Sequence, residues 1–422
     1  MPAPVLKRLP NGLPILTVPM MGTASVTVLA MVNIGSRYET KSEQGMSHLL
    51  EHMLFKGSAK WPTAKDIAQT LDSVGADYNA FTAKDQTGYY VKVAHEHLPL
   101  AIDIVADMIW RPKLDAAELN CEKKVICEEI KMYEDNPLMH IGDLLESEVF
   151  RGSSLGINIA GSIKSVTALN RTQLDQYHRR YYRPRNLLVV VAGKLTAATG
   201  RRLRAKFSEP WPGQTGSFTP FKVSQATPRV VIQRKPTQQV QLALGFPSYG
   251  YRHKNRLGLD LLALVLGGNM SSRLFMRLRE REGLCYSIGA AAEQYEGAGA
   301  LTVQAGLDTS RLTMAIRLIR EELERVVAEP ISAAELTKAK EYIRGKLTLA
   351  MENSSAQAHW AAKQYLFEHT RESLPEFLAR VSRVRVGELS RAARDVISFK
   401  RANLALIGPC QDAKRWQRLV EP

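Results

Sequence analysis

The strongest constraint on the fold of this chain is an internal repeat at about half its length. The run Ala116–Leu119 recurs 217 residues later as Ala333–Leu336, and Asn186-Leu187 recurs at the same offset as Asn403-Leu404. One repeat of this period is typical of a duplicated domain and not of a solenoid of short units. A chain of 422 residues is also long for a single domain. We therefore expect two domains of like fold.

Each half mixes strand-like and helix-like segments. Runs rich in β-branched or alternating apolar residues predict strands over Ser25–Val32, Tyr89–Val93, Val240–Phe246 and Leu301–Ala305. Helices are predicted over Ala64–Val74, with Thr63 as N-cap and Gly75 just past the end, and over Arg311–Val327. Grouped strands and helices favour the α+β class, in which each domain is a mainly antiparallel sheet with helices packed on one face.

A stretch rich in proline and glycine, Ser208–Gly216, separates the halves and suits a linker. We predict a first domain over residues 1–210 and a linker over residues 211–228. A homologous second domain is predicted over residues 229–422. We expect the first domain to bind a metal ion, because the candidate ligands lie there, and the second domain to bind none.

Charge and composition restrict the class of protein. The net charge of +15 could suit nucleic acid, but the basic residues are dispersed among glutamates and no nucleic-acid motif is present. We therefore expect a solvated basic surface and no nucleic-acid partner. No run approaches the roughly 18 uncharged apolar residues of a membrane span, and the first residues do not resemble a signal peptide. Cys121, Cys127, Cys285 and Cys410 have no zinc or disulfide spacing, so a cytoplasmic location is expected.

The motif with most chemical content is His48-Leu49-Leu50-Glu51-His52, within the apolar, helix-compatible segment Met46–Phe55. On a helix, residues four apart lie one turn apart on the same face, so both imidazoles can reach one metal ion. Glu51 lies beside them, where a carboxylate can hold or deprotonate a metal-bound water. A catalytic zinc site usually has three protein ligands, so a third ligand must come from elsewhere.

Candidates for the third ligand lie in a predicted long helix, Glu118–Met132. Glu122 and Glu129 are seven residues apart, nearly on one stripe and beside apolar residues. A surface helix more usually places glutamates on its solvated face, and Glu128 fits that interpretation better. Composition alone leaves the same interpretation open for Glu122 and Glu129.

These motifs and their surroundings resemble the pitrilysin-type (M16) metallopeptidases, over essentially the whole chain. The likeness rests on the spacing from His48 to Glu129 and on four further segments, Gly45–Ser47, Met53–Gly57, Asn79–Thr82 and Met132–Pro137. The length suits the short, two-domain members, which include mitochondrial processing peptidase. The resemblance also implies two like-folded domains in each chain.

The resemblance implies a role for each site residue. His48, His52 and Glu129 would be the ligands of one Zn²⁺ per chain, and Glu51 would be the general base. Glu122 would be a supporting carboxylate in the catalytic site. Asn79 and Ala80 would lie in an edge strand that binds substrate by pairing with its backbone.

The second half has lost every position of this metal set. The equivalent positions, from aligning Gly57 with Gly268 and from the offset of 217, hold Leu259, Leu262, Ala263, Ala339 and Lys346. Arg279 and Tyr286, seven apart, instead resemble the pair with which the family's non-metal half engages substrate. A guanidinium and a phenol can donate hydrogen bonds to a peptide carbonyl or to its developing oxyanion.

We therefore expect a zinc endopeptidase that hydrolyses extended or unfolded peptides, with Glu51 activating the metal-bound water. The resemblance implies an enclosed chamber in which a metal half works opposite an Arg–Tyr half. Because this chain carries both sets, a homodimer is expected, and a heterodimer with a silent partner is the alternative. The competing function is a catalytically silent peptide-binding or assembly subunit, like the core subunits of respiratory complexes. The intact metal set argues against it.

Overall fold

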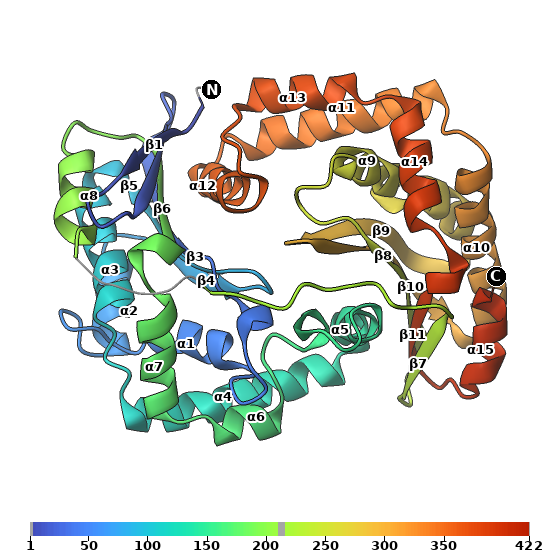
Figure 1. Cartoon of the computed structure of the whole chain (residues 1–422), viewed down its shortest axis with the longest axis horizontal. Helices are drawn as coiled ribbons and strands as arrows, with labels where there is room; N and C mark the ends of the chain where they lie inside the picture. The colour runs from blue at the N-terminus through green and yellow to red at the C-terminus, as the bar shows by residue number, and fades with distance from the viewer. Residues whose placement is uncertain (1–2, 210–215, 422) are drawn as a thin grey trace. The chain divides into compact units, whose positions relative to one another are not determined.

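The computed structural model of the chain describes residues 3–209 and 216–421, which fall into two compact units (Figure 1). Unit 1 comprises Met1–Ile130, Ile157–Phe218 and Lys346–Phe377, and unit 2 comprises Lys131–Gly156, Thr219–Gly345 and Leu378–Pro422. Residues 211–215 of the predicted linker lie outside the described residues.

Unit 1 is built on a six-stranded sheet in the order β1-β2-β6-β3-β5-β4, in which only the β2–β6 pair is parallel. Its strands are β1 (Val5–Arg8), β2 (Pro14–Pro19), β3 (Ser25–Val32), β4 (Asp77–Thr82), β5 (Thr87–Ala94) and β6 (Leu187–Gly193). Seven helices share a core with one face of this sheet: α1 (Met46–Leu54), α2 (Ala64–Asp72), α3 (Leu98–Trp110), α4 (Ala116–Asp135), α6 (Ile163–Ala168), α7 (Arg171–Tyr181) and α8 (Thr199–Phe207).

Unit 2 is built on a five-stranded sheet in the order β7-β11-β8-β10-β9, in which only the β7–β11 pair is parallel. Its strands are β7 (Arg229–Arg234), β8 (Gln239–Ser248), β9 (Cys285–Tyr295), β10 (Ala298–Asp308) and β11 (Asn403–Gly408). The helices that share its main core are α9 (Arg256–Gly267), α10 (Leu312–Ala328), α11 (Ala333–Ala350), α14 (Val386–Val396) and α15 (Ala413–Val420). The second half also contains helix α13 (Leu374–Arg383) and two π-helical segments, Phe275–Arg281 and Gln364–Glu368.

The two sheets confirm the predicted duplication and the α+β class. Apart from the extra edge strand β1, the order β2-β6-β3-β5-β4 in unit 1 matches β7-β11-β8-β10-β9 in unit 2. The repeated sequence segments begin equivalent helices, since α4 starts at Ala116 and α11 at Ala333. Both sheets are mainly antiparallel, as expected.

The expectation of helices on one face only is incomplete, because one helix also covers the opposite face of each sheet. Helix α12 (Ser354–Lys363) follows α11 in the second half of the sequence but packs on the sheet of unit 1. Helix α5 (Pro137–Val149) follows α4 in the first half but packs on the sheet of unit 2 (Figure 1). The compact units therefore differ from the sequence halves 1–210 and 229–422 by these exchanged segments.

Small residues allow these two helices to lie close to the strands. In α12, Ala358, Ala361 and Ala362 are fully buried against the sheet of unit 1. In unit 2, a Cβ atom on Gly245 of β8 would lie 2.9 Å from a methyl group of Leu145 in α5. Central strands such as β6 are buried at every residue, so the sheet is covered by other elements on both faces.

Most predicted elements are present with small shifts at their ends. Strand β3 spans the predicted residues, and α10 begins and ends one residue later than predicted. Helix α2 starts at the predicted cap, where the Thr63 side chain accepts a hydrogen bond from the Asp66 N–H. Gly75 beyond that helix has φ of 63°, which glycine adopts without strain.

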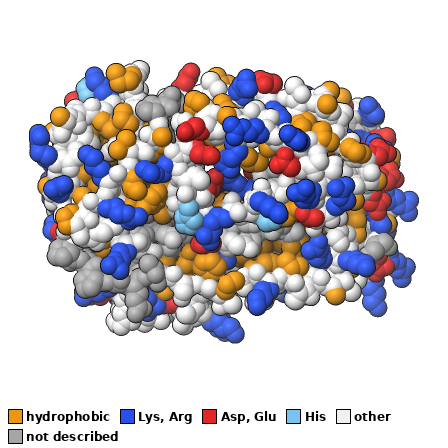
Figure 2. Space-filling view, turned by 45° about the horizontal axis from the view of Figure 1, so that its top comes forward, with side chains coloured by type: hydrophobic (Ala, Val, Ile, Leu, Met, Phe, Trp, Pro, Cys, Tyr) orange, Lys and Arg blue, Asp and Glu red, His pale blue; other side chains and the backbone are white. Residues whose placement is uncertain are grey.

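The described surface carries charges of both signs, and the cysteines are unpaired. Figure 2 shows Lys and Arg side chains spread over the visible face and interspersed with acidic ones. Within the described residues, no helix combines the length and the apolar character needed to cross a membrane. All four cysteines are free thiols.

The packing of α12 predicts that an alanine-to-leucine substitution lowers the free energy of unfolding by different amounts at two positions. Ala358→Leu inserts three carbon atoms into a fully buried contact and should lower the free energy of unfolding by about 1–3 kcal/mol. Ala356→Leu, on a partly exposed side of the same helix, should change it by less than about 0.5 kcal/mol. Urea denaturation of both variants measures this difference, and equal effects would contradict the packing described.

Candidate metal centre

The side chains of the histidine motif point away from the core of unit 1, because the opposite side of helix α1 is buried in that core. Leu49, Leu50, Met53 and Leu54 are fully buried in the core of unit 1. His48, Glu51 and His52 are only half-buried and lie on the other side of the helix. The alternation of apolar and polar positions at helical spacing therefore directs all three polar side chains to one place.

The start of α1 is held by a carboxylate from outside the helix. Gly45, the N-cap residue, offers no side chain, and both oxygens of Glu39 take its place. They accept hydrogen bonds from the backbone N–H groups of Gly45 at 2.8 Å and Ser47 at 2.7 Å. Burial raises the pKa of Glu39 to about 8. The Ser47 hydroxyl bonds to the Tyr177 hydroxyl at 2.8 Å, which adds a second buried attachment.

Two imidazoles and a carboxylate from α1 and α4 converge on one point. A carboxylate oxygen of Glu129 lies 3.7 Å from His48 Nε2 and 3.6 Å from His52 Nε2. One potential ligand atom from each of the three residues lies within 4.8 Å of the others. Tetrahedral zinc with ligands at about 2.0–2.1 Å separates neighbouring ligand atoms by about 3.3 Å, so small side-chain movements suffice. Among the described residues, this is the one such group of histidine, cysteine and acidic side chains.

A hydrogen bond prepares His52 for metal binding. The Glu122 carboxylate lies 3.0 Å from His52 Nδ1, and the ammonium of Lys56 lies 2.5 Å from its other oxygen. With Nδ1 bonded to a carboxylate, Nε2 can present its lone pair to a metal ion. Burial is the largest single effect and opposes a charge on both partners. The hydrogen bond between them and the nearby charges together outweigh it, so the pKa of His52 is raised and that of Glu122, which Lys56 also contacts, is lowered.

His48 is suited to metal binding by its burial. Removal from water, with a smaller effect of the neighbouring His52, lowers the pKa of His48 to about 4. The imidazole is therefore neutral near pH 7, which is the form that binds metal ions. Its Nδ1 atom is buried and makes no hydrogen bond to the part of the chain that the structure describes. Two imidazole nitrogens and one carboxylate together match the ligand set of a catalytic zinc site.

The Glu51 carboxylate is hydrogen-bonded to the edge strand of the sheet in unit 1. The Thr82 hydroxyl at the end of β4 donates a hydrogen bond of 2.6 Å to one oxygen of the Glu51 carboxylate. Burial raises the pKa of Glu51, and the bond from Thr82 opposes this shift in part. A carboxylate with a raised pKa beside a metal site can accept a proton from water.

Asn79 and Ala80 lie in β4, which is the edge strand of the sheet in unit 1. They pair with Tyr90 and Tyr89 of β5, and the Asn79 side chain accepts a hydrogen bond from the Ala80 N–H at 2.8 Å. A pocket of about 260 Å³ adjoins this strand, lined by Phe55, Lys56, Ala64, Ile67, Ala68, Tyr78 and Asn79. The predicted strand is therefore present, at a sheet edge and next to the helix that carries the histidines.

Arg279 and Tyr286 lie together in unit 2. Arg279 belongs to the π-helical segment and Tyr286 is the second residue of β9. The guanidinium carbon of Arg279 lies 5.3 Å from the ring centre of Tyr286 and 4.7 Å from that of Phe275. Because Tyr286 is 79% exposed, its hydroxyl is accessible to a ligand. The structure thus brings the two predicted residues side by side.

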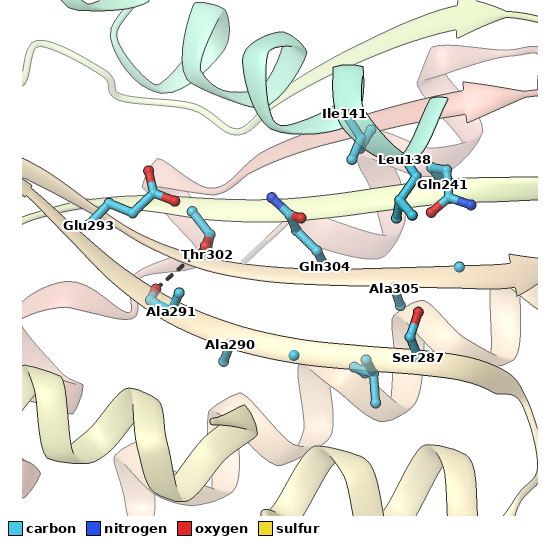
Figure 3. A pocket seen from close by; sticks show the side chains of 13 residues that line it. Leu138, Ile141, Gln241, Ser287, Ala290, Ala291, Glu293, Thr302, Gln304 and Ala305 are labelled. Carbon is cyan, nitrogen blue, oxygen red and sulfur yellow. Dashed lines mark hydrogen bonds between the residues drawn. The ribbon is translucent and has the colours of Figure 1, made fainter. Parts of the chain in front are cut away.

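A groove of about 400 Å³ lies on the sheet of unit 2, and its lining includes Ser287, the residue that follows Tyr286 (Figure 3). Leu138 and Ile141 point into it from α5, and β8, β9 and β10 supply polar side chains that include Gln241, Ser287 and Gln304. Sequence reasoning did not find this groove, because its residues come from four separate elements and form no motif.

Four of the five positions in the second half that correspond to the metal set are part of the core of unit 2, and the fifth, Lys346, is exposed. Leu259 and Leu262 in α9 are fully buried, and Ala263 and Ala339 are 3% and 2% exposed. These side chains pack against each other and against the sheet, where a charged ligand set would lack partners. Three residues that support the centre in unit 1, Glu39, Lys56 and Thr82, carried no separate sequence signal.

The chain is similar, over nearly its full length, to proteins named as zinc proteases. A family model described as "Insulinase (Peptidase family M16)" matches residues 15–162, and one described as "Peptidase M16 inactive domain" matches residues 168–343. "Uncharacterized zinc protease YmxG" of Bacillus subtilis is 35% identical, over 91% of this chain and 93% of the relative. "Uncharacterized zinc protease SCO5738" of Streptomyces coelicolor is 33% identical, over 96% of this chain and 89% of the relative.

Solved structures show the same fold. A protease from Helicobacter pylori superimposes with a TM-score of 0.90 at 21% identity, covering 97% of this chain and all of that one. A chain in a structure of complex III from Candida albicans superimposes with a TM-score of 0.83 at 18% identity, covering 99% of both chains. At these identities the likeness concerns the fold alone.

The hydrogen bond from Glu122 to His52 predicts a measurable contribution to metal affinity. Glu122→Gln replaces the charged acceptor and should weaken zinc binding about 10- to 100-fold, because the orientation and basicity of His52 are lost. Glu118→Gln, on an exposed position of the same helix, should leave the affinity unchanged. Competition with a chromophoric zinc chelator measures both values. Equal affinities for wild type and Glu122→Gln would show that this carboxylate does not support the centre.

Proposed function

Since the chain belongs to peptidase family M16, we propose that it is a zinc-dependent endopeptidase acting on extended or unfolded peptides. A protease role is supported by the relatives named zinc proteases. The observation that carries the proposal is the convergence of His48, His52 and Glu129, with Glu51 beside them on the same helix. The substrate class and the roles of individual residues are parts of the proposal.

We propose that His48, His52 and Glu129 hold one zinc ion per chain. Their donor set and spacing fit zinc, and Glu122 fixes the orientation of His52. When bound, zinc supplies Lewis acidity, which polarises a peptide carbonyl and makes a water molecule acidic near pH 7.

Glu51 acts as the general base in this proposal. Its carboxylate accepts a proton from the attacking water and delivers it to the leaving amine. Burial raises its pKa, and a carboxyl group with a raised pKa can both accept and return a proton near neutral pH. Strand β4 would align the peptide by backbone pairing at Asn79 and Ala80, which gives affinity with little dependence on side chains.

Arg279 and Tyr286 would contribute hydrogen bonds to the substrate carbonyl from a non-metal unit. Because one chain carries both this pair and the metal set, we propose a homodimer in which each site combines groups from both chains. The enclosed chamber that the family resemblance implies stays a prediction. The alternative of a silent subunit is not favoured, because such a subunit has no chemical need for a metal set supported by a buried carboxylate.

Substitutions should separate the metal ligands from the base. His48→Ala, His52→Ala and Glu129→Gln should each lose zinc, because each removes one of three ligands. Glu51→Gln should keep zinc but lower peptide cleavage by about 10²- to 10⁴-fold, because it removes only a proton acceptor. Elemental analysis and a fluorogenic peptide assay measure the two properties. Loss of zinc from Glu51→Gln, with wild type loaded, would move Glu51 into the coordination sphere.

Subunit exchange tests the proposed homodimer. Glu51→Gln and Arg279→Ala should each be inactive alone. A mixture should recover activity after exchange, because a mixed dimer contains one site with every group intact. A mixture of Glu51→Gln with His48→Ala is the matched control, since both changes lie in the metal set and no intact site can form. Verified exchange without recovered activity would show that the two sets do not cooperate between chains.

A further inference from the structure

A single hydrogen bond joins Glu51 to the edge strand of unit 1. It runs from the hydroxyl of Thr82, the last residue of β4, to Glu51 Oε2 over 2.6 Å. This length lies in the range of about 2.5–2.7 Å that is typical of a hydroxyl donating to a charged carboxylate. We propose that Thr82 is a positioning residue for Glu51, through which the strand that aligns the peptide also orients the base. The inference rests on the proposed function.

The position of Glu51 is not determined by its helix alone. Helix α1 fixes the backbone, but a glutamate side chain keeps three rotatable bonds between Cα and the carboxylate. A general base must come within about 2.6–3.2 Å of the proton that it takes. By holding Oε2, Thr82 restricts these rotations and leaves the second oxygen for the reacting water. The hydroxyl can donate or accept, so it can stay bonded when Glu51 gains a proton.

Thr82 is itself held firmly, because the turn that follows it is anchored in the interior. The backbone carbonyls of Ala83 and Lys84 accept hydrogen bonds from the N–H groups of Ser36 at 3.2 Å and Arg37 at 3.1 Å. The Arg37 guanidinium pairs with the Asp85 carboxylate at 2.7 Å, with side chains 0% and 2% exposed. Removing one partner of a buried, directly bonded ion pair leaves an unpaired charge in the interior, which strongly destabilises the fold. The end of β4 therefore has little freedom to move.

The segment Gly35–Glu39, which contains Ser36 and Arg37, also holds the helix that carries Glu51. Its last residue, Glu39, bonds to the first backbone N–H groups of α1. Its first residue, Gly35, approaches the turn so closely that a Cβ atom would lie 2.1 Å from the Ala83 carbonyl oxygen. Both ends of the bond between Thr82 and Glu51 are thus attached to one five-residue frame. This arrangement suits a group that must be positioned in advance of the reaction.

A purely structural role for Thr82 would require bulk at this site, whereas the positioning role requires its hydroxyl. Thr82→Val keeps the shape of the side chain and removes the donor. Thr82→Ser keeps the donor and removes a methyl group. The two variants therefore separate the two roles. Thr70→Val is the matched control, because it removes a hydroxyl that bonds only within helix α2, to the Asp66 carbonyl.

The test uses the full-length, zinc-loaded protein and the best-cleaved peptide of a fluorogenic library. Thr82→Val should lower kcat about 10- to 100-fold, with KM within about twofold and zinc content unchanged. Thr82→Ser should restore kcat to within about threefold of wild type, and Thr70→Val should match wild type. In the Glu51→Gln background, Thr82→Val should leave the peptide Kd unchanged, because it acts through the base.

Three results would overturn the inference while leaving the proposed function intact. They are wild-type kcat in Thr82→Val, an equal loss in Thr82→Val and Thr82→Ser, and a rise in KM or Kd at constant kcat. The third would assign Thr82 to peptide binding. If Thr82→Val does not fold, Thr82→Ala against Thr82→Ser gives the same comparison. A wild-type protein that binds no zinc or cleaves no peptide would instead refute the proposed function, and this inference with it.

Discussion

The candidate centre depends on where helix α1 lies, because α1 supplies three of its polar groups. With nine residues, this helix is too short to be stable by itself, so its place is set by its surroundings. Four buried apolar side chains attach one side to the core, each contributing roughly 1.5–3 kcal/mol. Glu39 then fixes the first turn through two backbone hydrogen bonds. Only with the helix held in this way can α4 and β4 present Glu129 and Thr82 to the same point.

The two copies of the duplicated fold differ in the side chains that they present. Both units have the same strand order and equivalent helices, so the fold itself does not decide which one carries chemistry. In unit 1 the helices that flank the centre keep polar side chains that satisfy one another, as Glu122 does with His52 and Lys56. In unit 2 the same places hold Leu259 and Leu262, which bury apolar surface without needing partners. Unit 2 instead presents Arg279 on its π-helical segment, Tyr286 on β9 and a groove on its sheet.

Helical spacing alone placed His48, Glu51 and His52 on one face, because residues three and four apart lie together. Spacing left Glu122 and Glu129 open as surface glutamates, and only the family resemblance gave them roles in the centre. The other supporting contacts could not be predicted. Thr82 and Lys56 are ordinary residue types for their positions, and nothing local shows that a threonine 31 residues away will bond to Glu51. Such partners are chosen by how the strand and the helix pack.

The duplication, the α+β class, most strands and helices and the candidate ligands could be inferred from the amino-acid sequence. The strands and helices follow from the periodicity of residues a few positions apart, which reports the local backbone. The duplication follows from segments that recur 217 residues apart. Only the tertiary structure decided that α5 and α12 cover the opposite sheet from their own half of the sequence. It also decided which oxygen or nitrogen each site residue bonds to. Contacts of this kind join residues tens to hundreds of positions apart, and they depend on the shape and small residues of two packed surfaces, which no local pattern records.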